Sequence, residues 1–164
     1  MSISWEHLAD CLRQELAAYG GLLHLFEQQQ HCLLNRDAQE VMSLGAAIEA
    51  EAQQVALSRA QREQAVADFA AQLRQPRTST LRALLPLVAA EARPLLQALI
   101  DEVNMLLHRV RRVSRHNHTL LTRAVEVQQE VLQQLRPTAF LKTYSPAGTV
   151  SVTGSPATRL CTAS

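Results

Sequence analysis

Residues 96–135 read LQALIDEVNMLLHRVRRVSRHNHTLLTRAVEVQQEVLQQL, without a glycine or a proline. Apolar residues recur in this segment at alternating gaps of three and four, a heptad pattern that predicts one long amphipathic helix. At about 1.5 Å per residue, the helix would be about 60 Å long. Partner helices, from this chain or from another molecule, must cover its seam. The seam consists of Leu96, Leu99, Val103, Leu106, Val110, Val113, Asn117, Leu120, Ala124, Val127 and Val131.

The rest of the chain supplies further helices. An apolar stripe predicts a first helix over residues 4–35, either bent at Gly20-Gly21 or approached there by another backbone. A second helix over residues 38–74 begins at Asp37 and Glu40, which have the spacing of a capping box. Its second half is the least firmly predicted, because arginines interrupt a stripe rich in alanine. A short helix follows, ending near Ala90. We therefore expect an all-α fold, an elongated antiparallel bundle of three long helices plus a short one.

Composition divides the chain into a helical domain, residues 1–136, and a flexible C-terminal tail, residues 137–164, which is rich in Ser, Thr, Pro and Gly. The segment around Phe140, Leu141 and Tyr144 places three large hydrophobic side chains close together in an otherwise small and polar tail. This segment is either a short recognition motif or a part that folds back onto the bundle.

The net charge of +1 hides an asymmetry between the two halves of the chain. Residues 1–74 hold ten acids and five arginines, and residues 75–164 hold five acids and eleven basic residues. The basic run at 108–118 therefore predicts a solvated face or one that pairs with the acidic first half, and we expect no nucleic-acid partner. The three cysteines, the opening residues and the lack of a long apolar run predict a cytosolic protein with reduced thiols and no membrane insertion.

Asn117 occupies an a position of the seam, where a polar side chain costs stability and fixes the register of packing. The alternative is a slight rotation of the heptad that leaves Asn117 half exposed. We expect the buried, register-setting role.

No motif with the spacing of a catalytic or metal site is present. His116 and His118 are two residues apart and would not converge on one ion on a helix. The sequence contains no Gly-rich phosphate loop and no Gly-x-Ser-x-Gly elbow. We expect no enzyme activity, no metal and no cofactor.

Three features taken together resemble the FlgN family of flagellar type III export chaperones. They are the Arg36-Asp37-Ala38 turn between two amphipathic helices, Asn117 followed by Leu120-Leu121 on the long helix, and the late segment TYSPAG at 143–148. The resemblance implies a cytoplasmic chaperone that binds C-terminal helical segments of hook–filament junction proteins. It would prevent their premature assembly and deliver them to the export gate. Tyr144 matches the family tyrosine that contacts the export-gate membrane protein.

An unusually long seam beside a second helix with a thin apolar stripe leaves apolar surface for an added helix, which suits helix-in-groove recognition. We expect the client to bind near the tail, and each of these side chains has the alternative of being ordinary core. The alternative function is a structural coiled-coil protein that self-assembles through the seam at 96–135, and a homo-oligomer is left open. The candidate client-binding residues are Leu120, Leu121, Val127, Val131, Leu135, Phe140 and Leu141.

Overall fold

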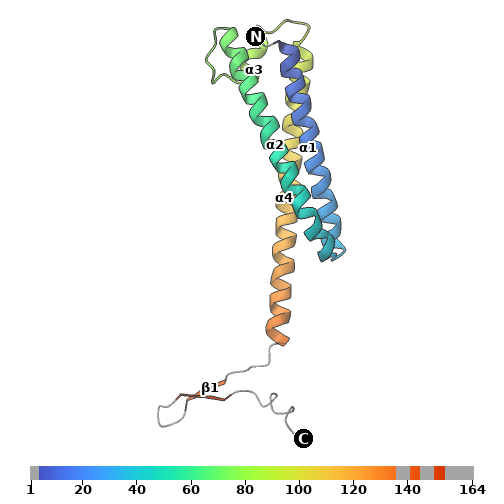
Figure 1. Cartoon of the computed structure of the whole chain (residues 1–164), viewed down its shortest axis with the longest axis vertical. Helices are drawn as coiled ribbons and strands as arrows, with labels where there is room; N and C mark the ends of the chain where they lie inside the picture. The colour runs from blue at the N-terminus through green and yellow to red at the C-terminus, as the bar shows by residue number, and fades with distance from the viewer. Residues whose placement is uncertain (1–3, 136–140, 145–149, 154–164) are drawn as a thin grey trace. The chain divides into compact units, whose positions relative to one another are not determined.

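The computed structural model describes residues 4–135, 141–144 and 150–153. The first range is helical and contains α1 (Trp5–Leu34), α2 (Ala38–Gln72), α3 (Leu81–Leu84), the 3-10 helix η1 (Leu85–Leu87) and α4 (Arg93–Leu135) (Figure 1). The other two ranges are the strands β1 (Leu141–Tyr144) and β2 (Val150–Thr153). The chain divides into two compact units, and the boundary falls inside α4 between Leu120 and Leu121.

Short polar side chains begin the helices. The side chain of Ser4 accepts a hydrogen bond from the backbone N–H of His7 and starts α1. Asp37 accepts one from the N–H of Glu40 at 3.1 Å and starts α2, as the capping-box spacing predicts. Thr80 caps α3 in the same way. The starts of α1 and α2 agree with those expected from the sequence.

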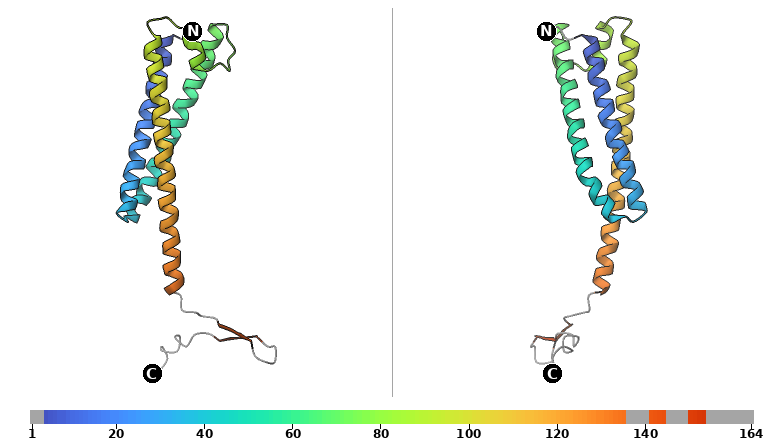
Figure 2. Two further views of the ribbon diagram at one scale, coloured as in Figure 1. Left: turned by 180° about the vertical axis from the view of Figure 1, so that it is seen from behind. Right: turned by 45° about the vertical axis from the view of Figure 1, so that its right-hand side comes forward.

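In the first unit, α1, α2 and the first part of α4 lie side by side (Figure 2). Leu8, Leu12, Leu84 and Leu96 are at most 2% exposed and form the centre of the core. Gly20 and Gly21 both lie in α1, which continues through them without a break, and a Cβ atom on Gly20 would meet nothing within 4 Å. A Cβ atom built on Gly21 would lie 2.6 Å from Glu51 Oε1, so the missing side chain leaves room for the end of the Glu51 side chain of α2, and no backbone approaches closely there.

The second half of α2, which the sequence predicted least firmly, is the part of this helix that packs into the core. All the buried residues of this helix lie in its second half, and residues 38–57 contain none. Most of the buried residues are small, which lets the helices approach closely. The charge on the stripe is also compensated, because Arg62 Nε donates to Glu15 Oε2 at 2.5 Å. The buried residues are Ser58, Ala65, Val66, Phe69 and Ala70.

The second unit contains a small antiparallel hairpin. β1 pairs with β2 so that Leu141 lies opposite Thr153 and Tyr144 lies opposite Val150. These eight residues depart from the all-helical expectation, because the tail was predicted without regular structure. The flexibility of the tail stays a prediction, and Phe140 lies outside the described residues.

Candidate functional site

The burial of α4 changes along its length. Seam residues Leu96, Leu99, Val103 and Val110 are buried, and the buried series ends at Asn117. Leu120 and Leu121 are half-buried, and every residue from 122 to 135 is exposed. The apolar periodicity nevertheless continues to the end of the helix, so its last part carries apolar side chains that the described residues do not cover.

These side chains gather on one face. With about 100° between successive residues, every apolar side chain between 121 and 135 except that of Val127 lies within about 60° of the direction of Gln128. We call the following set the α4 apolar face: Leu121, Ala124, Val125, Gln128, Val131, Leu132 and Leu135. The exposed fractions of Val125, Val131, Leu132 and Leu135 are 50%, 48%, 61% and 71%. Contiguous exposed apolar surface of this kind makes the face a candidate binding site.

The predicted candidates fall into three groups. Val131 and Leu135 belong to the α4 apolar face, and Val127, 51% exposed, lies at its edge. Leu120 and Leu121 are half-buried at its start. Leu141 and Tyr144 lie in β1, in the same unit.

Val125 and Leu132 are members of the face that the heptad pattern missed. A strict heptad has 3.5 residues per turn, whereas a straight helix has 3.6, so the apolar stripe drifts by about 20° per heptad. The drift moves the strict heptad positions away from both residues, which on a straight helix lie within about 60° of the direction of Gln128. A stripe drawn with the period of a straight helix would have found them.

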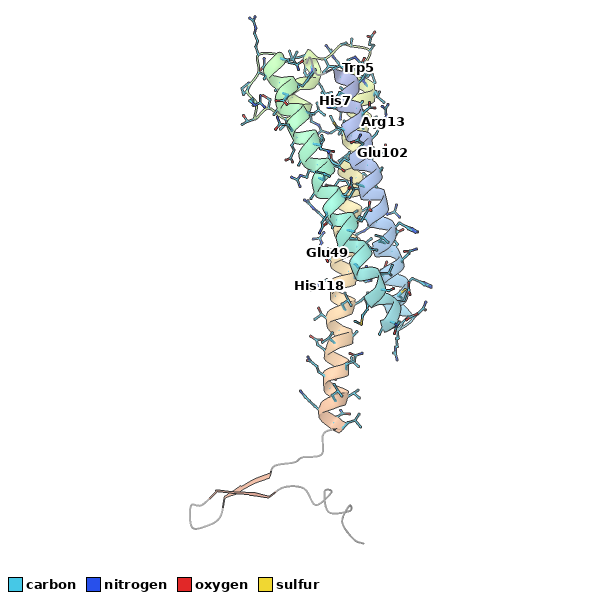
Figure 3. The ribbon with its side chains drawn as sticks, viewed as in Figure 1. Trp5, His7, Arg13, Glu49, Glu102 and His118 are labelled. Atoms are coloured by element: carbon cyan, nitrogen blue, oxygen red, sulfur yellow. The ribbon has the colours of Figure 1, made fainter. Side chains whose placement is uncertain are left out.

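Asn117 lies where the buried seam ends and is 1% exposed. Its Nδ2 donates to the backbone carbonyl of Phe26 at 2.7 Å and to Gln29 Oε1 at 3.0 Å, which ties α4 to α1. Its Oδ1 is buried and has no hydrogen-bond partner within the described residues. The next residue, His118, is exposed (Figure 3). The burial rules out the half-exposed alternative, and the register-setting role stays a prediction.

Charged groups connect the helices of the first unit. Arg109 Nη2 on α4 donates to Glu27 Oε1 on α1 at 2.8 Å, the kind of pairing that the charge asymmetry predicts. Glu15 is 1% exposed and pairs with Arg62, a contact that no sequence pattern indicated. Burial, together with the negative charge of Glu15, raises the pKa of the nearby Tyr19.

An open groove of about 540 Å³ lies between α1 and α2. His7, Asp10 and Cys11 line it from α1, and Gln64 and Asp68 line it from α2. The Cys11 Sγ lies 3.7 Å from His7 Nε2, but burial and the neighbouring Asp10 carboxylate raise the pKa of this thiol. The thiolate is therefore scarce at neutral pH, and the groove holds no activated nucleophile.

The described residues contain neither a cluster of metal ligands nor a membrane-spanning helix. No group of three or more His, Cys, Asp or Glu side chains is placed to hold a metal ion there. Within the same residues, no helix combines the length and the apolar character that crossing a membrane requires.

Comparison with known proteins identifies the family. The family model described as FlgN protein matches residues 1–151, which include the three long helices and most of the hairpin. The chain belongs to the FlgN family. No curated protein and no solved structure matches it. Membership of the FlgN family gives the chain the general role of a flagellar export chaperone, and confirms the resemblance found in its sequence.

Proposed function

We propose that this chain is a cytoplasmic chaperone of the flagellar type III export system whose clients are hook–filament junction proteins. It binds their C-terminal amphipathic helices on the α4 apolar face, prevents early assembly, and delivers them to the export-gate membrane protein. The proposed role includes no catalytic step. The observation that carries the proposal is the exposed apolar stripe on the last four turns of α4.

The α4 apolar face has the properties that a helical client needs. Its members follow one another at gaps of three and four residues, which is the spacing at which one helix presents anchors to another. Covering a half-exposed Val or Leu gains about 1 kcal/mol, roughly half of the value for full burial. Four such side chains give a gross gain of about 4 kcal/mol before the cost of association. The client helix must therefore bring several large apolar residues of its own.

The matched experiment compares two neighbouring positions on α4. Leu132→Glu places a carboxylate in the α4 apolar face, whereas Gln133→Glu places the same group on the polar side of the helix. Each full-length variant is mixed with C-terminal fragments of candidate junction proteins and analysed by size-exclusion chromatography with light scattering. We expect the wild type and Gln133→Glu to form a complex of fixed stoichiometry, and Leu132→Glu to lose it.

Two results would contradict the proposal. Equal binding by Leu132→Glu and Gln133→Glu would show that the client does not bind the α4 apolar face. A chain that ignores every fragment and forms a large homo-oligomer would favour the structural coiled-coil alternative. Circular dichroism of both variants checks that the helices remain intact, which we expect because both side chains are exposed.

The contact with the export gate is assigned to Tyr144 by resemblance to the family. Tyr144 ends β1, and its backbone pairs with Val150 of β2. A residue at this place is separated in sequence from the α4 apolar face, so client binding and gate contact can be tested with different variants.

A further inference from the structure

The α4 apolar face has the same spacing in both directions from its centre. Gln128 is the central member, and the other six lie in pairs at distances of three, four and seven residues on either side. All six are apolar, and the only polar member is the central one. The pairs are Val125 with Val131, Ala124 with Leu132, and Leu121 with Leu135.

A surface with this symmetry is complementary to a second copy of itself. Two identical helices that run antiparallel are related by a two-fold axis, and each contact then occurs twice. When the two-fold axis passes beside Gln128, a residue that precedes Gln128 in one copy meets a residue that follows Gln128 in the other. The two residues lie on the same flank of the face. Val125 then faces Leu132 of the second copy, with Ala124 facing Val131 and Leu121 facing Leu135. We propose that a second copy of this chain docks antiparallel on the α4 apolar face, centred on Gln128.

The central glutamine favours a second copy of the chain as the molecule that covers this face. Its amide carries both donors and an acceptor, so two Gln128 side chains at the axis satisfy each other. A helix that brings no polar side chain to this point would leave the amide covered without a partner, which is costly. A single polar residue in an apolar seam also selects one register, because shifted alignments bury it against apolar groups.

The charges of this segment agree with the antiparallel pairing. Arg123, Glu126 and Glu130 are the charged residues between 121 and 135. All three point more than about 120° away from the direction of Gln128, when successive residues are taken 100° apart. The pairing therefore buries no charge and places no like charges opposite each other.

The size of the contact predicts a reversible dimer. The face extends over fourteen steps of about 1.5 Å, or about 21 Å, which is short for a permanent interface. The same side chains serve the proposed client, so a bound client and a second copy exclude each other. The dimer is inferred from the face alone, and it can be tested without any client.

The first test compares two glutamines of α4, Gln128 and Gln133. In sedimentation velocity of the full chain at about 1–300 μM, a range that brackets weak association, we expect the wild type to show a monomer–dimer equilibrium. Gln128→Lys places two ammonium groups at the axis and should weaken the dimer by about tenfold or more. Gln133→Lys adds the same charge on the polar side, about 140° from the direction of Gln128, and should leave the dimer unchanged. A wild type that stays monomeric throughout, or equal effects of the two variants, would overturn the proposal.

The second test determines the orientation. Cys11, Cys32 and Cys161 are replaced by alanine, and Val125→Cys and Leu132→Cys are made separately in that background. We expect a bifunctional thiol reagent to link the two variants when they are mixed and to leave each alone unlinked. Linkage of Val125→Cys to itself would show a parallel pair and would overturn the antiparallel arrangement.

Discussion

Removing Arg62 tests the contribution of the buried ion pair between α1 and α2. In Arg62→Ala, the carboxylate of Glu15 stays buried, 1% exposed, and loses the guanidinium whose Nε donates to it at 2.5 Å. Breaking a buried pair from one side costs about 3–5 kcal/mol. Because Arg62 is 22% exposed and water can reach the vacated site, we take the lower end, about 3 kcal/mol. For a chain of this size, the melting temperature should fall by about 6–12 °C.

Arg59→Ala is the control. Arg59 lies almost one turn earlier on α2, and its partner Glu63 is about half exposed, as is Arg59 itself. Such a surface pair contributes at most about 1 kcal/mol. Thermal and urea unfolding, followed by circular dichroism, should separate the two variants clearly. Replacing both Glu15 and Arg62 by leucine should restore most of the stability, since no uncompensated charge remains. Equal losses in Arg59→Ala and Arg62→Ala would refute the reasoning.

Three other predictions concern single residues. Asn117→Leu should stabilise the chain by about 1 kcal/mol because it removes a buried acceptor without a partner; a lower melting temperature would mean that the bonds to α1 contribute more. Tyr19 has a raised pKa, so the unfolded chain loses its proton first, and stability should fall as the pH rises past the ordinary value of 10.0. Tyr19→Phe should flatten that fall in alkaline unfolding curves. Tyr144→Ala should leave client binding and helicity intact but reduce export in cells, and a parallel loss of client binding would contradict separate roles.

Local signals made the starts of the first two helices predictable, whereas the short helix, expected to end near Ala90, continues only as far as the end of η1 at Leu87. Asp37 and Glu40 started α2 where the capping-box spacing placed them, and Thr80 capped α3. The heptad pattern also placed Asn117 on the buried side of α4. These features depend on residues within a few positions of one another, which is the range over which a sequence pattern carries structural information.

Features that depend on distant parts of the chain were not predictable. Glu15 and Arg62 are separated by 47 positions, and only their contact explains why a charge is tolerated on the α2 stripe. The pattern on α4 identified which side of the helix is apolar, but it contained no information on where the covering helices end. The exposure of Val125 and Leu132 therefore emerged only when burial was known.

The change of burial within α4 has a consequence for hydrogen exchange. Amides before Asn117 lie in the packed part of the helix, and their exchange requires opening of the core. Amides from 122 to 135 are held by helical hydrogen bonds whose side chains are exposed, and an isolated helix of that length is marginal in water. These amides should exchange orders of magnitude faster in the free chain. Any molecule that covers the α4 apolar face would slow the exchange of these amides. Hydrogen exchange along this one helix therefore measures both the stability of the core and the occupancy of the α4 apolar face.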